Sequence, residues 1–276
     1  MELDQLKVTR YQVADAIATI TLHRPERMNA WTGRMHAEYR ALLARAADDP
    51  AVRVIVVTGS GRGFCVGADT AALEGHVSRG GYDPGLGDDI AMPGYGVRPE
   101  FDADFAYMFG IAKPIIAALN GPAAGVGLVL ACYCDLRFAA SGIKLTTSHG
   151  RLGLPAEYGL SWLLPRLIGM TRAADLLLSS RVVLSEEAVT LGLVNRVVAP
   201  EALMETTYAY ASMLATEVAP SSLAVTKLQM YRDLHGDAAS SVIDAGERMS
   251  DMMRGADFAE GVAALTERRP PNFPDR

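Results

Sequence analysis

Apolar and polar positions follow different patterns in the two parts of the chain. In the first part, short apolar or β-branched stretches typical of buried strands alternate with stretches of helical periodicity. We expect strands over residues 13–22, 52–57, 113–119, 135–140 and 144–147, and helices over 32–47 and 128–132. From Ser161 onward the pattern is mostly helical, with long helices over 201–219, 221–234 and 240–254. This order predicts an α/β core of strand-helix-strand crossovers followed by a helical region.

A glycine-lined turn over residues 120–127 is the most informative local motif. It follows the apolar strand that ends at Leu119, and it precedes an uninterrupted apolar stretch from Leu128 to Cys132. A turn that opens a buried helix directs free backbone N–H groups outward. A second glycine-rich loop, residues 59–69, also follows a strand. The two loops can therefore bring two backbone N–H donors to one point.

Composition narrows the class of protein. The chain has 276 residues, of which 50% are hydrophobic and 21% charged, so it can bury a sizeable core and disorder is not expected. A net charge of −6 disfavours a general nucleic-acid or anionic-membrane surface. Three cysteines, two of them in an apolar stretch, argue against a disulfide framework, and we expect a reducing cytoplasm. The N-terminus lacks the pattern of a signal peptide, and no apolar run is long enough to span a membrane.

Several short motifs, in order and spacing, resemble the crotonase (enoyl-CoA hydratase/isomerase) superfamily over nearly the whole chain. They lie at residues 23–25, 28–30, 67–69, 113–117, 120–121, 134–137, 192–194, 260–261 and 267–270. The resemblance implies an α/β fold, a spiral of β-β-α units, with the acyl-CoA site in residues 1–200. Residues 201–276 would form a helical region that caps the site and builds trimers, often stacked as hexamers.

The resemblance also implies which residues bind the substrate. Two backbone N–H groups form an oxyanion hole for the thioester carbonyl in this family, and they correspond here to Ala68 and Val126. No cofactor is bound permanently, because coenzyme A is part of the thioester. In the family, coenzyme A lies against the turn after the first strand, where Arg24 is the best candidate to meet its phosphates. The matching contacts with coenzyme A are Arg24, Met28, Ala30, Ala68, Asp69 and Gly125.

The sequence departs from the family at the positions that carry the chemistry. Hydratases of the family use two glutamates, and the corresponding positions here are Val129 and His149. Adding water to an enoyl thioester needs a polarised carbonyl, a positioned water and groups that move protons. Valine can do none of this. The candidate that remains is Glu157, at an offset where dienoyl-CoA isomerases and chlorobenzoyl-CoA dehalogenases of the family carry an acidic residue.

Each acid-base candidate has a structural alternative. An apolar surrounding would raise the pKa of Glu157 and suit it to proton transfer. The same side chain could instead cap the helix near Ser161 or pair with Arg151 or Arg166. The imidazole of His149 could transfer a proton, or neighbouring hydroxyl groups could simply hold it by hydrogen bonds.

Three further sequence features bear on the substrate site, on phosphate binding and on metal binding. The irregular stretch over residues 75–105 is read as a lid that shapes the substrate site. Residues 59–63 resemble a phosphate-binding loop but lack the Lys-Ser/Thr that follows one. No His, Cys and Asp cluster has metal-ligand spacing, so no metal is expected, and Cys132 and Cys134 belong to the core.

Three functions stay open. The family resemblance favours an enoyl-CoA hydratase in which Glu157, with or without His149, replaces the usual pair. The loss of both glutamates favours an enoyl-CoA isomerase or an acyl-CoA hydrolase that uses Glu157 as its single acid and base. The third is a non-catalytic binder of acyl-CoA.

Overall fold

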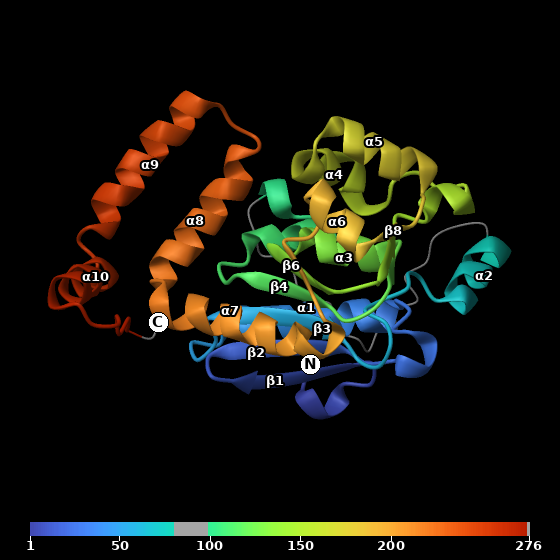
Figure 1. The fold of residues 1–276 in the computed structure, drawn as a ribbon, viewed down its shortest axis with the longest axis horizontal. Helices are drawn as coiled ribbons and strands as arrows, with labels where there is room; N and C mark the ends of the chain where they lie inside the picture. Colours follow the sequence, from blue (N-terminus) through green and yellow to red (C-terminus); the bar gives the residue numbers. More distant parts are fainter. Residues whose placement is uncertain (80–98, 275–276) are drawn as a thin grey trace.

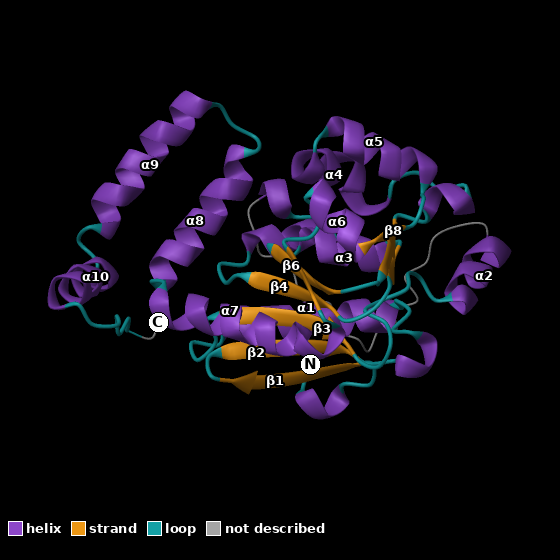
Figure 2. Cartoon of the chain, viewed as in Figure 1, coloured by secondary structure: helices purple, strands orange, loops and turns teal. Residues whose placement is uncertain are grey.

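The computed structural model describes residues 1–79 and 99–274. Its centre is a six-stranded sheet, most of whose strands are labelled in Figures 1 and 2. The strand order is β1-β2-β3-β4-β6-β9, parallel throughout except for the antiparallel pair β1-β2. The strands are β1 (Thr9–Ala14), β2 (Ile17–Leu22), β3 (Val54–Gly59), β4 (Ile115–Leu119), β6 (Leu136–Ala140) and β9 (Arg196–Val198). A second sheet contains β5 (Ala123–Ala124), β7 (Lys144–Thr146) and β8 (Val183–Leu184) in that order.

The helices confirm most of the pattern predicted from the sequence. Thr32 caps the first helix, and its hydroxyl accepts a 3.1 Å hydrogen bond from the N–H of Met35. The helices are α1 (Gly33–Asp48), α2 (Thr70–Arg79), α3 (Val126–Tyr133), α4 (Leu160–Ile168), α5 (Met170–Ser179), α6 (Ser185–Leu191), α7 (Leu203–Glu217), α8 (Pro220–Asp233), α9 (Ala238–Met252) and α10 (Ala256–Glu267). None of these helices, over the described part of the chain, is both long and apolar enough to cross a membrane.

Two local expectations were wrong. The strand expected over residues 13–22 is a hairpin, because Asp15 and Ala16 both have positive φ and turn the chain between β1 and β2. Residues 75–79, expected to be irregular, belong to α2, which continues to Arg79. Good helix formers and an N–H of Ala71 that donates to the Asp69 carboxylate start this helix. Residues 80–98 of the proposed lid lie outside the described residues.

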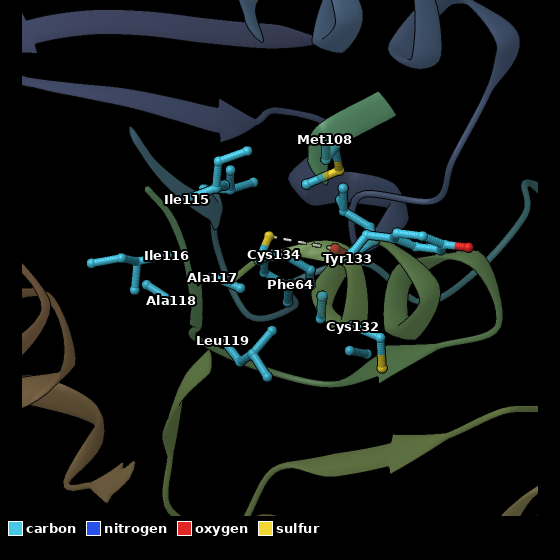
Figure 3. Close-up of a cluster of buried hydrophobic side chains, with 14 of the residues drawn as sticks. Phe64, Met108, Ile115, Ile116, Ala117, Ala118, Leu119, Cys132, Tyr133 and Cys134 are labelled. Atoms are coloured by element: carbon cyan, nitrogen blue, oxygen red, sulfur yellow. Dashed lines mark hydrogen bonds between the residues drawn. The ribbon is translucent and has the colours of Figure 1, made fainter. Parts of the chain in front are cut away.

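Figure 3 shows a part of the buried core in which Ile115–Leu119 of β4 lie near Cys132 and Tyr133 at the end of α3. All eight residues of α3 are buried, so this helix has no polar face. The helix packs closely against the backbone at Cys65 because residue 127 is glycine. A Cβ at this position would lie 2.1 Å from the carbonyl oxygen of Cys65. The three cysteines are free and buried, as expected for core residues.

The C-terminal helices divide into two sets. Helix α7 packs across β2, β3, β4 and β6, whereas α8 and α9 extend side by side away from the sheet and lead to α10 (Figure 1). Lys227 of α8 is buried and pairs with Asp135 at 2.7 Å, and Tyr231 donates to the same carboxylate at 2.8 Å. Asp135 is therefore an anchor for α8. The division of the chain at residue 200 stays a prediction.

Candidate active site

The two glycine-rich loops lie side by side. Residue 68 pairs with Trp31 as an isolated parallel bridge, in which the N–H of Trp31 donates to the carbonyl of Gly67 and the N–H of Asp69 donates to the carbonyl of Trp31. The other loop is joined to this one where the N–H of Ala124 donates to the carbonyl of Cys65 at 3.0 Å. These hydrogen bonds fix the loop before α2 against the turn that opens α3.

Each loop carries an N–H group of interest without a partner among the described residues, at Ala68 and at Val126. Successive N–H groups of an extended chain point to opposite sides, so the bonds of Gly67 and Asp69 to Trp31 turn the N–H of Ala68 away from that strand. Val126 is the first residue of α3, where an N–H has no partner inside the helix. Within the described residues, neither N–H donates to a backbone or side-chain acceptor.

Gly125 brings the two loops and a carboxylate together. Its φ of 49° and ψ of −126° are accessible to glycine alone. A Cβ built on Gly125 would lie 3.6 Å from Oε2 of Glu157, 3.8 Å from Cα of Gly67 and 4.0 Å from Cβ of Ser148. The carboxylate of Glu157 thus lies beside the residue that precedes the free N–H of Val126.

The carboxyl group of Glu157 is partly buried. Burial raises the pKa of this carboxyl, and the nearby His149 lowers it by a smaller amount. The residues that the structure describes provide no hydrogen bond or ion pair for the carboxylate. It does not cap α4, whose N-cap is Gly159, and Arg166 instead contacts Trp162. The structural alternatives for Glu157 are therefore wrong.

His149 also lies near Glu157, whose pKa it lowers. The side chain is only 5% exposed, and its Nδ1 is buried without a hydrogen-bond partner in the described part of the chain. The neighbouring hydroxyl groups do not hold the ring: Thr147 donates to the carbonyl of Leu176. The residue before it, Ser148, has a φ of 60°, which is uncommon for serine.

The other expected glutamate position carries no polar group. Val129 is 1% exposed within α3. Glu157 is therefore the carboxylate that the described residues place beside Gly125.

The turn after β2 is fixed to the loop before α2. Arg24 forms an ion pair with Asp69 at 2.9 Å and donates to the carbonyl of Ala30 at 2.7 Å. Burial raises the pKa of Asp69, but hydrogen bonds from Arg24 and from the N–H of Ala71 outweigh it and hold the pKa below its usual value. Met28 lies in this turn in a left-handed conformation. Arg24 thus supports the loop that carries Ala68.

Residues 59–63 are fixed by two asparagines. Asn29 donates to the carbonyl oxygens of Ser60 and Gly63, and Asn120 donates to those of Gly61 and Gly63. The loop therefore presents carbonyl groups inward to amide donors and does not form a phosphate cradle. Among residues 1–79 and 99–274, no group of three or more His, Cys, Asp or Glu side chains could hold a metal ion.

Known structures share this fold. A crystal structure named "probable enoyl-CoA hydratase/isomerase" from Mycobacterium abscessus superimposes with a TM-score of 0.85 and 31% identity, covering 97% of this chain and 99% of that one. The fold is therefore the α/β crotonase fold with two sheets and C-terminal helices.

The sequence gives the family. The enoyl-CoA hydratase/isomerase family model matches residues 12–276, and the chain belongs to this family. A "probable enoyl-CoA hydratase" of Mycobacterium tuberculosis is 38% identical over 267 residues, which are 94% of this chain and 90% of that protein. The 1,2-epoxyphenylacetyl-CoA isomerase of Escherichia coli is 33% identical over 95% of this chain and 96% of that protein. The protein is thus a crotonase-family enzyme of acyl-CoA metabolism.

Sequence reasoning did not identify one contact of the site. The hydroxyl of Tyr133, at the end of α3, donates to the carbonyl of Tyr158, which follows Glu157. The available signal was a tyrosine in an otherwise apolar helix, because a buried tyrosine hydroxyl needs a partner.

Proposed function

We propose that the protein is an enoyl-CoA isomerase in which Glu157 is the single acid and base. The observation that carries this proposal is the place of the Glu157 carboxylate, beside Gly125 and without a second carboxylate at Val129. The relatives named above include both hydratases and an isomerase, so family membership alone does not decide between the two reactions.

The proposed reaction needs one group that both takes and returns a proton. The N–H groups of Ala68 and Val126 donate to the thioester carbonyl, and the Glu157 carboxylate removes a proton from C2 of a 3-enoyl thioester. The electron pair moves into a dienolate whose oxygen the two N–H groups stabilise. The protonated Glu157 then returns the proton at C4, and the product is the conjugated 2-enoyl thioester.

Hydration is the second candidate, and one observation favours it. Nδ1 of His149 is buried without a partner among the described residues, and His149 lowers the pKa of Glu157. A base that orients water toward C3 and an acid that protonates C2 would together add water. In this alternative His149 and Glu157 replace the usual pair of glutamates.

The binding of coenzyme A follows the family pattern in this proposal. The thioester reaches Ala68, Asp69 and Gly125, while the rest of the coenzyme lies along the turn that contains Arg24, Met28 and Ala30. No permanently bound cofactor takes part in the proposed steps. Because Nη1 of Arg24 already contacts Asp69 and Ala30, this residue has a role in positioning the Ala68 loop as well as a proposed role at the phosphates.

We also propose that α9 and α10 take part in a homotrimer, alone or stacked as a hexamer. Large apolar side chains of these helices are exposed in the single chain, at 72% for Val242, 64% for Ile243 and 81% for Leu265. Burial of such side chains against another copy would be favourable.

The proposed reaction is tested with a panel of 2-enoyl and 3-enoyl thioesters of coenzyme A in deuterated water. Isomerisation predicts growth of the absorbance of the conjugated thioester from 3-enoyl substrates and no gain of water in the mass spectrum. Deuterium enters only to the extent that the proton on Glu157 exchanges with solvent before it returns to C4. Gain of one water by 2-enoyl substrates would replace the first candidate with the second. An unchanged panel would contradict both candidates for these acyl groups.

A further inference from the structure

We propose that Tyr133 is a positioning residue for catalysis, whose hydroxyl holds the segment that carries Glu157 against the acyl site. This inference rests on the proposed role of Glu157 in the reaction. It concerns a side chain that does not itself contact the substrate, and that acts through the backbone of Tyr158.

The segment after Glu157 has an unusual conformation. Tyr158 has a φ of 46° and a ψ of 42°, and Gly159 follows with a φ of 72°. Two successive left-handed residues turn the chain sharply between Glu157 and α4. A tyrosine pays an energetic cost in this region, so the surroundings must hold it there.

The hydroxyl of Tyr133 supplies such a restraint. It donates a 2.7 Å hydrogen bond to the carbonyl oxygen of Tyr158. The same hydroxyl also lies close to Gly159, where an added Cβ would be 2.9 Å from the hydroxyl oxygen. The ring of Phe105 also meets the ring of Tyr158 edge-on, with centroids 5.0 Å apart. Tyr133 is 4% exposed, so water does not replace this bond easily.

Helix α3 then connects the two halves of the proposed site. Its first residue, Val126, carries one free N–H, and its last residue, Tyr133, holds the segment of Glu157. An eight-residue α-helix is a rigid element about 12 Å long. Helix α3 therefore helps to fix the distance between the N–H of Val126 and the carboxylate of Glu157, which would otherwise depend on a loop alone.

A matched control exists in the same aromatic cluster. Tyr231 is also buried, and its ring stacks on Phe109 at 3.8 Å, while Phe109 in turn contacts Tyr133. Its hydroxyl donates to Asp135, the anchor of α8, and not to the Glu157 segment. Tyr231→Phe therefore removes a comparable buried hydroxyl without touching the proposed positioning contact.

The test is a double-mutant cycle on the full chain, made of wild type, Tyr133→Phe, Glu157→Gln and the double variant. Tyr231→Phe is measured beside it as the control. We expect Tyr133→Phe to lower kcat about tenfold, the equivalent of one hydrogen bond, with little change in KM. Tyr231→Phe keeps the wild-type kcat, even where both variants lower Tm. The double variant is no slower than Glu157→Gln, because the hydroxyl acts through that carboxylate.

The outcomes separate this inference from the proposed function. A kcat of Tyr133→Phe within twofold of wild type overturns the positioning role, as does an equal loss in the Glu157→Gln background. An equal loss in Tyr231→Phe also overturns it, because the effect would then come from packing. Full activity of Glu157→Gln overturns the proposed function itself, and the positioning role with it.

Discussion

Replacement of Glu157 by glutamine is the most direct test of the proposed chemistry, because it changes charge and proton transfer with almost no change in shape. The described residues offer the carboxylate no hydrogen bond or ion pair, so the substitution breaks no contact within them. The amide cannot remove or return a proton at the acyl group. Activity and stability should therefore change in opposite directions.

The expected loss of rate is at least about a hundredfold, the low end for a general acid-base group, which corresponds to about 2.7 kcal/mol in the barrier. The substitution leaves the N–H groups of Ala68 and Val126 in place, so the binding of the thioester should change little. We expect the loss in kcat and not in KM.

The expected change in stability follows from the pKa. Burial raises the pKa of Glu157 in the folded chain above its ordinary value of about 4.3. A raised pKa means that the folded state binds the proton more tightly than the unfolded state. Protonation of Glu157 therefore stabilises the folded state fully below about pH 4.3, and this stabilisation is lost as the pH rises through the raised pKa. Above the raised pKa the charged carboxylate is unfavourable, and there Glu157→Gln should have the higher Tm.

Two measurements check this pair of effects: steady-state rates on the substrate found in the panel, and thermal unfolding at pH 7 and near pH 4. The gain in Tm of the variant over wild type should be larger at pH 7. A helix cap would behave in the opposite way, since its removal costs about 1 kcal/mol, or about 2–4 °C in a chain of this size. A lower Tm together with an unchanged rate would refute the reasoning.

Three further predictions test the remaining parts of the site and the assembly. Val126→Pro deletes one N–H at the first helical position, where proline is well accepted, and should lower kcat about 10²–10³-fold with unchanged circular dichroism; undiminished activity would exclude this oxyanion donor. The pH profile of kcat/KM should rise as the pH passes upward through the raised pKa of Glu157, and a falling limb at higher pH would indicate a second group, as hydration with His149 requires. Ile243→Asp should shift the protein to smaller species in light scattering, and an unchanged mass would place the interface elsewhere.

Periodicity and turn chemistry predicted much of the fold because these signals are local. The buried strands β3 and β4 appear as short apolar runs, and Thr32 marks the start of α1 within one residue. The hairpin between β1 and β2 was not predicted, since its turn uses Asp15 and Ala16 and alanine gives no turn signal. Its left-handed conformation is imposed by the pairing of the two strands.

The site was less predictable because its parts meet only in three dimensions. The family resemblance pointed to Glu157, but its position beside Gly125 depends on the left-handed backbone at Tyr158, which no residue type there predicts. Arg24 was expected at the phosphates of coenzyme A because it lies in the turn where the family binds this coenzyme. Its ion pair with Asp69 depends on the bridge between Trp31 and Ala68, which is a long-range contact.

The absence of a carboxylate at Val129 is itself consistent with the choice of isomerisation. In the proposed reaction Glu157 becomes neutral when it takes a proton from the acyl group, and the negative charge moves to the enolate oxygen beside the N–H groups of Ala68 and Val126. The total charge of the site stays constant during this step. A second buried carboxylate would repel both the ionised Glu157 and the enolate, and one of the two carboxylates would have to bind a proton. Hydration can use that second group to hold water, but a proton shuttle within one acyl chain gains nothing from it.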